Sequence, residues 1–330
     1  MHSNLQSYCG EQVLVDEGSG KTQPAIVVVG SINADLIAYF DEDNRIGNYV
    51  FGDGFRFNLG GKGLNQAVNV AAAGLATVLI GRIGDDVFGK KITTDLEQVG
   101  VSTEFITVDK DAHTGIGHVR VSAAGEYDTV VVNGANSNLK YQDVDSALSA
   151  IGNISYGLMN YEIASNVISS ASDEIRKRGG STVINFSPIA PEVNYVISDA
   201  DYLVANAQEI NALLGEDSDD IHFLAKRIQT QGAKNVIVTL GEQGAFGLDA
   251  EGNAHKVPGE SAQVVNTIGA GDTFLAAFTA ALHSGAVFST SLEFANHAAS
   301  LVCAKQESFL TKDELLQAAR KFEIGLLSKK

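Results

Sequence analysis

The segment that decides the fold of this chain is residues 266–274, which read NTIGAGDTF. The small residues at positions 269–271 let backbone N–H groups come close to a ligand, and an apolar helix is predicted directly behind them, over residues 274–282. Free N–H groups and the helix dipole favour an anion at such a helix start. Asp272 lies at the edge of this predicted anion site, where a carboxylate suits proton abstraction from an attacking hydroxyl better than binding alone. The alternative interpretation is an ordinary turn in which Asp272 caps the helix.

Composition limits the classes of protein that this chain can belong to. Its 330 residues, of which 45% are hydrophobic, can bury the core of a large α/β domain. The formal net charge of −17 disfavours a nucleic-acid partner. Two distant cysteines, Cys9 and Cys303, form neither a disulfide framework nor a zinc pattern. No apolar run is long enough to cross a membrane and the start lacks a signal-peptide pattern, so we expect a cytoplasmic protein.

Strands alternate with helices along most of the sequence. Short β-branched or apolar runs predict buried strands, and each is followed by a helical or turn segment. These strands are expected at residues 25–29, 77–80, 156–159, 182–185, 202–204 and 235–240. The alternation predicts an α/β fold: a doubly wound, mostly parallel sheet sandwiched by helices.

Two strand-rich insertions interrupt this alternation. Residues 36–57 read as short strands and turns, and residues 114–133 contain a predicted hairpin. Together they are expected to form a small β-sheet lid beside the main domain, which spans residues 25–330. Residues 1–24 are polar and lack apolar periodicity, so we interpret them as a flexible extension.

Polar residues follow several of the predicted strands. Asn33 and Asp35 come just after the first strand, and Glu162 follows the strand at 156–159. The carboxyl ends of parallel strands are where open α/β sheets bind ligands. A second Gly-rich loop, residues 60–66 (GGKGLNQ), also opens a helix. Amides and carboxylates beside such a loop suit a polyhydroxylated ligand, although turns and helix caps explain each residue taken singly.

Together these segments resemble the ribokinase family, also called the PfkB carbohydrate kinases. The resemblance runs from about residue 26 to about residue 304. It rests on GGKGLNQA at residues 60–67, on the segment 266–279 around Gly-Ala-Gly-Asp, and on GSINAD at residues 30–35. Both Gly-rich motifs occur in the family's order and at its spacing, which makes the match specific.

The resemblance implies roles for individual residues. Asp272 matches the catalytic base of the family. Gly269, Ala270 and Gly271 match the residues that form the family's anion hole. The positions expected to contact the sugar are Asn33, Asp35, Gly61, Lys62, Asn65, Glu162 and Asp272. Those expected to hold the nucleotide are Asn206, Glu209, Thr239, Gly241, Glu242, Gly244, Gly271 and Asn296, with Glu209 also supporting the metal ion.

The resemblance also implies a reaction and partners. The expected activity is an ATP- and Mg²⁺-dependent kinase that phosphorylates the terminal hydroxyl of a pentose, with D-ribose as first candidate. The alternatives are a kinase for another sugar or a nucleoside, and a non-catalytic sugar-binding regulator. A homodimer formed through the lid is expected. Binding to nucleic acid or to a membrane is not expected.

Two departures from the family pattern qualify these expectations. Asn266 stands where ribokinases usually carry an Asp that helps to hold a monovalent cation, and residues 305–308 replace a Gly-rich segment of the same site. We therefore expect weak or absent potassium activation, since an amide is a poorer cation ligand than a carboxylate. The family's Gly-Glu-Thr near the lid is also missing, and residues 47–50 (GNYV) occupy that region.

Overall fold

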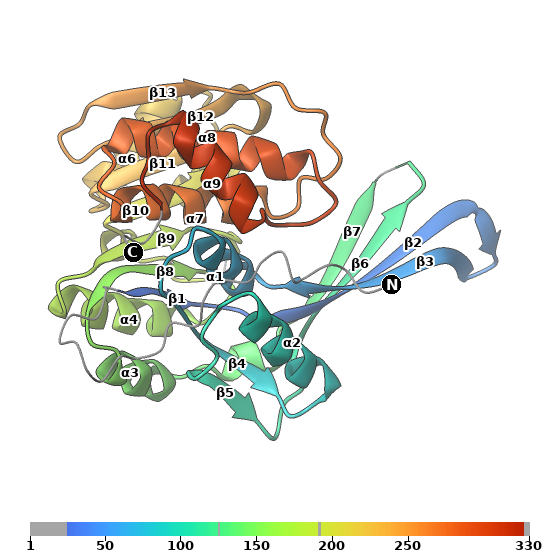
Figure 1. The fold of residues 1–330 in the computed structure, drawn as a ribbon. Coiled ribbons are helices and arrows are strands. Elements are labelled where there is room, and N and C mark those ends of the chain that lie inside the picture. Colours follow the sequence, from blue (N-terminus) through green and yellow to red (C-terminus); the bar gives the residue numbers. More distant parts are fainter. Residues whose placement is uncertain (1–24, 125, 191–192, 327–330) are drawn as a thin grey trace.

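The computed structural model describes residues 25–124, 126–190 and 193–326, and the predicted extension at residues 1–24 lies outside them. A nine-stranded sheet with helices on both faces forms the main body, and a separate four-stranded sheet projects from it (Figure 1). The predicted α/β class, with a small second sheet, is confirmed.

The main sheet is parallel except at one edge. Its strand order is β13-β12-β11-β10-β9-β8-β1-β4-β5, and only β12 and β13 run antiparallel to their neighbours. The strands are β1 (Ala25–Val29), β4 (Thr77–Gly84), β5 (Ile106–Asp109), β8 (Ile154–Asn160), β9 (Ser181–Asn185), β10 (Tyr202–Asn206), β11 (Asn235–Thr239), β12 (Gly244–Leu248) and β13 (Ala254–Pro258). The buried β-branched run of β1 lies in the interior of the sheet, as its sequence predicts.

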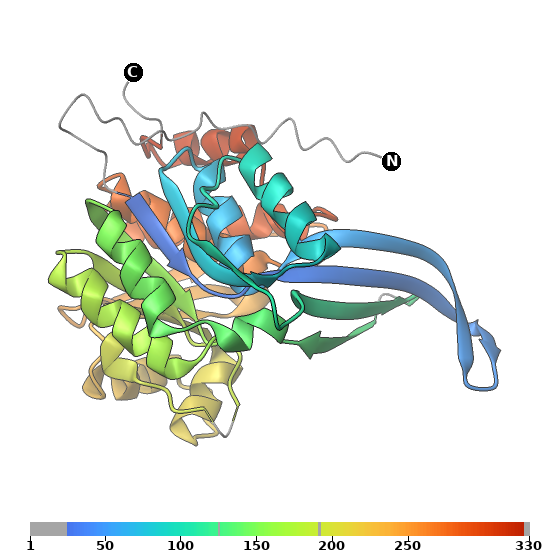
Figure 2. The same cartoon turned by 90° about the horizontal axis from the view of Figure 1, so that it is seen from below.

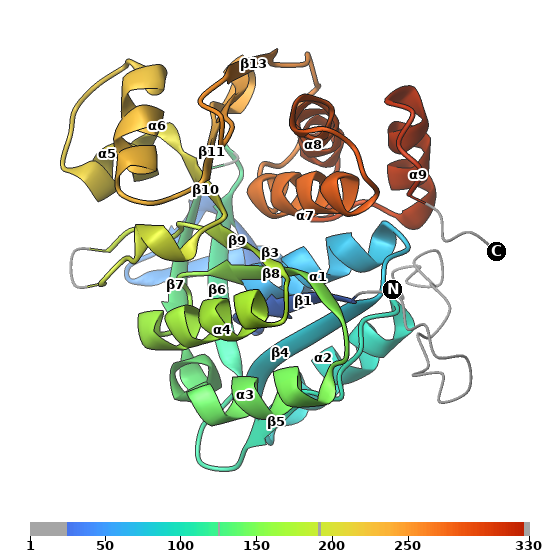
Figure 3. The same cartoon turned by 90° about the vertical axis from the view of Figure 1, so that its left-hand side faces the viewer.

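Two helical layers cover the faces of this sheet, as Figure 3 shows from the side. One layer holds α1 (Lys62–Ala72), α2 (Val87–Gln98), α7 (Ala270–His283), α8 (Phe288–Cys303) and α9 (Lys312–Lys321). The other holds α3 (Tyr141–Ala150), α4 (Ser165–Lys177), α5 (Ala207–Leu214) and α6 (Ile221–Thr230). Alternate residues of β1 serve the two cores, because successive side chains of a strand point to opposite faces.

The second sheet begins just after the carboxyl end of β1, where the chain enters β2. Its order is β3-β2-β6-β7, and its strands are β2 (Asn33–Ile46), β3 (Tyr49–Gly60), β6 (Gly115–Ser122) and β7 (Tyr127–Val132). The expectation of short strands and turns over residues 36–57 is wrong, since β2 and β3 are long strands of 14 and 12 residues. They form an arm that extends beyond β6 and β7 (Figure 2).

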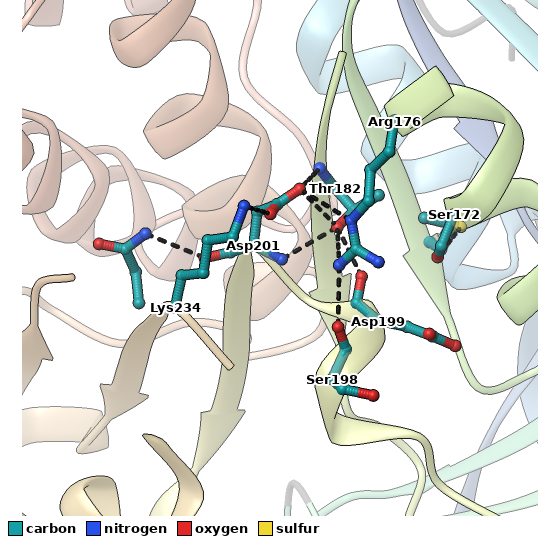
Figure 4. Close-up of polar contacts among 9 residues, drawn as sticks. Ser172, Arg176, Thr182, Ser198, Asp199, Asp201 and Lys234 are labelled. Carbon is teal, nitrogen blue, oxygen red and sulfur yellow. Dashed lines mark hydrogen bonds and ion pairs between the residues drawn. The ribbon is translucent and has the colours of Figure 1, made fainter. Parts of the chain in front are cut away.

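A charge cluster around the buried Asp201 lies at the amino-terminal end of the strands, on the side of the sheet away from the second sheet. Asp201, just before β10, accepts a hydrogen bond from the backbone N–H of Thr182 at 2.8 Å. The Nζ of Lys234 and the Nε of Arg176 lie 2.6 and 3.3 Å from its carboxylate (Figure 4). These partners hold the pKa of Asp201 below its ordinary value against the opposing effect of burial. Among the described residues, no helix is both long and apolar enough to cross a membrane.

Candidate active site

The two Gly-rich helix starts meet at the carboxyl edge of the main sheet. Asp272 lies in the first turn of α7 and is only 6% exposed. Its carboxylate accepts hydrogen bonds from Nε2 of Gln66 at 3.0 Å and from Nδ2 of Asn65 at 3.3 Å. The N-cap position of α7 is Gly269, and no side chain caps this helix. The capping interpretation of Asp272 is therefore wrong, and its side chain points to α1.

Charged groups of both signs lie near the Asp272 carboxylate. Burial raises the pKa of Asp272, while the nearby Lys62 ammonium and the Gln66 amide act to lower it. Burial acts to lower the pKa of Lys62, but the carboxylates of Asp272, Glu162 and Glu209 outweigh it and raise that pKa above its ordinary value. Lys62 is thus held as a cation among three carboxylates, where it can also neutralise an incoming anion.

Backbone geometry at the start of α7 suits an anion. Gly269 has φ of 83°, and a Cβ there would lie 2.3 Å from the carbonyl oxygen of Ser308, so only glycine fits. A Cβ at Gly271 would meet nothing within 4 Å. Within the described chain, no backbone acceptor bonds the N–H groups of Gly271 and Asp272. With Ala270 between the two glycines, this turn has the features of the predicted anion hole.

Asn33 and Asp35 are alternate residues at the start of β2, so their side chains lie on the same face of that strand. Oδ1 of Asn33 accepts a hydrogen bond from Nδ2 of Asn136 at 2.7 Å. Burial, and then the negative charges of Glu162 and Asp272, raise the pKa of Asp35 to about 7. The Asp35 carboxyl group therefore lies close to the carboxylates of Glu162 and Asp272.

Glycines on the neighbouring strands make room for Asn33 and Asp35. A Cβ at Gly115 would lie 2.2 Å from Oδ1 of Asn33. A Cβ at Gly60 or Gly117 would lie 2.1 or 2.3 Å from the Asp35 carboxyl group. Since real side chains cannot approach so closely, the strands beside β2 are shaped around these two polar side chains.

Glu162 joins the loops that follow β1, β3 and β8. Its Oε2 accepts hydrogen bonds from Oγ of Ser31 at 2.5 Å and from the backbone N–H of Lys62 at 3.0 Å. Gly61, just before Lys62, has φ of 87° and packs against the Ser31 carbonyl. The predicted sugar contacts Asp35, Lys62, Asn65 and Glu162 therefore come together with Asp272 at one edge of the sheet. Gly61 precedes Lys62, and Asn33 pairs with Gly60 across the neighbouring strands.

A small cavity of about 110 Å³ lies beside Lys62. It is lined by Lys62, Asn185, Ser187, Val204, Ala205, Asn206, Glu209, Thr239 and Gly271. Asn206 and Glu209 form a reciprocal capping box at the start of α5, with two hydrogen bonds of 2.8 Å. The cavity thus contains four of the predicted nucleotide residues beside Lys62.

Sequence patterns missed Asn185 and Ser187, which also line this cavity. Asn185 ends β9 and Ser187 follows it, so the rule that ligands bind at the carboxyl ends of strands could have indicated both.

The remaining predicted nucleotide residues lie outside the small cavity. Gly241 and Glu242 form an exposed turn between β11 and β12, and Gly244 begins β12. Asn296 of α8 donates a hydrogen bond from Nδ2 to the carbonyl of Pro258 at 3.1 Å. A groove of about 480 Å³ passes this turn and is lined by Asp219, Asp220, Ile221, His222, Leu240, Gln243, Ala245, Phe246, Lys256, Val257 and Pro258.

Comparisons with known proteins agree with this geometry. Residues 23–313 match the family model described as pfkB family carbohydrate kinase. The chain belongs to this family. PfkB carbohydrate kinases are phosphotransferases with an alcohol group as acceptor, so the protein is an enzyme of that class.

Individual relatives place this pfkB-family kinase near the ribokinases. It is 32% identical to ribokinase of Bacillus subtilis over 280 residues, which cover 84% of this chain and 93% of the relative. It is 28% identical to deoxyribokinase of Salmonella typhi, over 77% of this chain and 84% of the relative. Among solved structures, Arabidopsis thaliana ribokinase complexed with ribose and ATP superposes with a TM-score of 0.81, at 28% identity, over 90% of this chain and 99% of that one.

Proposed function

We infer that this kinase transfers the γ-phosphoryl group of ATP to the terminal hydroxyl of D-ribose, with Asp272 as general base. The observation that carries the proposal is the placement of Asp272. Its buried carboxylate contacts the predicted sugar residue Asn65, and Asp272 belongs to the helix turn whose N–H groups at Gly271 and Asp272 have no backbone acceptor within the described chain. The similarity to ribokinases, one of them solved with ribose and ATP, supports the choice of substrates.

The proposed reaction follows from these positions. Asp272 takes the proton of the sugar hydroxyl as its oxygen attacks the γ-phosphorus, and the bond from that phosphorus to the ADP oxygen breaks. The N–H groups of Gly271 and Asp272 and the Lys62 ammonium offset the negative charge on the transferring group. Asn33, Asp35 and Glu162 orient the sugar, and closure of the second sheet, the expected lid, over the sugar excludes water as a competing acceptor.

Magnesium fits this site only together with substrate phosphates. Among the described residues, no three His, Cys, Asp or Glu side chains gather as a ready metal site. Mg²⁺ in kinases usually keeps several waters and uses one or two carboxylates plus phosphates. Glu209 lines the cavity beside Lys62 and uses one carboxylate oxygen in its capping box, which leaves the other for a metal-bound water. When bound, the ion neutralises phosphate charge.

The proposal is tested by coupled ATP consumption with a panel of D-ribose, 2-deoxy-D-ribose, other pentoses, hexoses and nucleosides. We expect the highest kcat/KM with D-ribose and a 5-phosphate product. The similarity to deoxyribokinase makes 2-deoxy-D-ribose the second candidate, and a higher kcat/KM for it would reassign the substrate. Higher kcat/KM for a hexose or nucleoside would reject the pentose, and sugar binding without turnover would indicate a regulator.

A further inference from the structure

Gln66 is a buried polar residue to which the sequence patterns give no role. It lies in the first half of α1, one position after Asn65, and is 0% exposed. The next residues of α1, Ala67 and Val68, are buried and apolar. An amide here therefore interrupts the part of α1 that packs against the core and α7.

One hydrogen bond accounts for the orientation of this amide. Nε2 of Gln66 donates to Oδ1 of Asp272 at 3.0 Å. A carboxylate oxygen can only accept, so the NH₂ end of the amide must face it. Asn65 reaches the other oxygen, Oδ2, over a longer distance of 3.3 Å. Oδ2 therefore has the longer hydrogen bond of the two oxygens. A sugar hydroxyl can replace Asn65 as the partner of Oδ2.

The other end of Gln66 has no partner within the described chain. Its Oε1 is buried and accepts no hydrogen bond from any described residue. Burying an unsatisfied acceptor destabilises a fold, and an apolar side chain of similar volume would avoid that penalty. Stability alone therefore does not explain glutamine at this position, whereas its contact with Asp272 does.

We propose that Gln66 is a positioning residue, which fixes Oδ1 of Asp272 so that Oδ2 faces the hydroxyl to be phosphorylated. The proposal rests on the proposed function, because it assigns Gln66 a part in orienting the general base. A misplaced base loses turnover even when both substrates still bind.

The first test replaces Gln66 with methionine, which keeps the volume and removes both polar ends. For Gln66→Met we expect kcat with the best substrate to fall roughly 10- to 100-fold with little change in the sugar KM. The thermal midpoint should change little, because removal of the unsatisfied acceptor offsets loss of the hydrogen bond to the buried Asp272 carboxylate. A lower thermal midpoint with an unchanged kcat would show a merely structural role and overturn the proposal.

A second readout does not depend on turnover. Carbon-13 NMR can follow the titration of the Asp272 carboxyl, with its signal assigned by its loss in Asp272→Asn. Removing a hydrogen bond to the ionised form disfavours that form, so the midpoint should move up by about one pH unit in Gln66→Met. An unmoved midpoint would overturn the proposal. If the midpoint moves but the wild-type enzyme phosphorylates none of the panel, the proposed function fails and the contact stands.

Thr273→Val is the matched control. Oγ1 of Thr273 donates to Oδ1 of Asn69 at 3.2 Å, a buried bond between the same two helices that does not touch the Asp272 carboxylate. Its loss should lower the thermal midpoint and leave the Asp272 titration where it is. An equal shift of the titration in both variants would assign the effect to helix packing and reject the role of Gln66.

Discussion

Nδ2 of Asn65 lies 3.3 Å from Oδ2 of Asp272, although 207 residues separate the two in the sequence. Each residue belongs to the first turns of a helix that follows a Gly-rich loop, one in α1 and one in α7. The contact joins a predicted sugar residue to the proposed base. It makes the two loops parts of a single site, and it allows their roles to be separated by substitution.

Replacing the proposed base should abolish turnover while preserving binding. In Asp272→Asn the amide keeps the size of the side chain but cannot accept the proton, so we expect kcat to fall by about three orders of magnitude or more. Sugar affinity, measured by calorimetry, should change little. Turnover near the wild-type rate would show that Asp272 is not the base.

Asp35 should act on sugar affinity and not on turnover. We expect Asp35→Ala to raise the sugar KM about 10- to 100-fold, since hydrogen bonds of roughly 1–3 kcal/mol are lost. Steady-state kinetics measure this, and kcat should change much less. Asp43→Ala is the control, because Asp43 lies on the same strand but is exposed in the arm. An unchanged KM in Asp35→Ala would remove Asp35 from the sugar site.

The charge cluster around Asp201 should affect stability and leave catalysis alone. Asp201 is buried, but its partner Lys234 has a side chain that is 66% exposed and stays solvated when the pair is broken, so Asp201→Asn should lower the free energy of unfolding by roughly 1 kcal/mol. The folded pKa of Asp201 is depressed, so its contribution is present above the unfolded pKa of about 4 and is lost as pH falls through the folded pKa. Urea unfolding at pH 7 and at pH 3 should therefore show a smaller difference between variant and wild type at pH 3. An equal difference at both pH values would contradict this assignment.

Potassium should activate this enzyme little or not at all. Oδ1 of Asn266 accepts a hydrogen bond from the N–H of Ile268 at 3.0 Å, and its Nδ2 donates to the Gln306 carbonyl at 3.4 Å. The neutral amide already bonds its own loop, which leaves a weaker cation ligand than a carboxylate. Rates in potassium chloride and in choline chloride at equal ionic strength should agree within about twofold, since no bound cation is lost in the exchange. A many-fold rise with potassium would contradict the prediction.

The arm of the second sheet should mediate dimerisation. Tyr49, Phe51 and Phe55 of β3 are 73%, 59% and 67% exposed, and β3 is an edge strand of its sheet. Exposed aromatic groups on an open edge favour pairing with another chain. Light scattering should give a dimer for the wild type and a monomer for the double variant Phe51→Ser, Phe55→Ser. Phe223→Ser, on α6, is the control and should stay dimeric, whereas a monomeric wild type would reject the prediction.

Much of the site could be read from local patterns, because its residues sit at helix starts and strand ends. Sequence patterns predict that the two Gly-rich loops open helices and that Asn206 and Glu209 can form a helix cap, and the structure has both features. The roles of these residues in catalysis and binding come from the family resemblance and stay predictions. The length of β2 could not be inferred, since its acidic segment at residues 41–43 looks like a turn and only pairing with β3 makes it a strand. Gln66 was missed because its partner, Asp272, is close only in the folded chain.

The second sheet begins with the very residues proposed to hold the sugar, since β2 starts at Asn33 and continues through Asp35 into the arm. The proposed base, by contrast, belongs to α7, on a separate part of the chain. Changes in β2 can therefore alter the part of the proposed sugar site that Asn33 and Asp35 form while α7 stays the same. Exchanging β2 and β3 between relatives, with α1 and α7 kept, is then a direct engineering route to kinases with new sugar preferences.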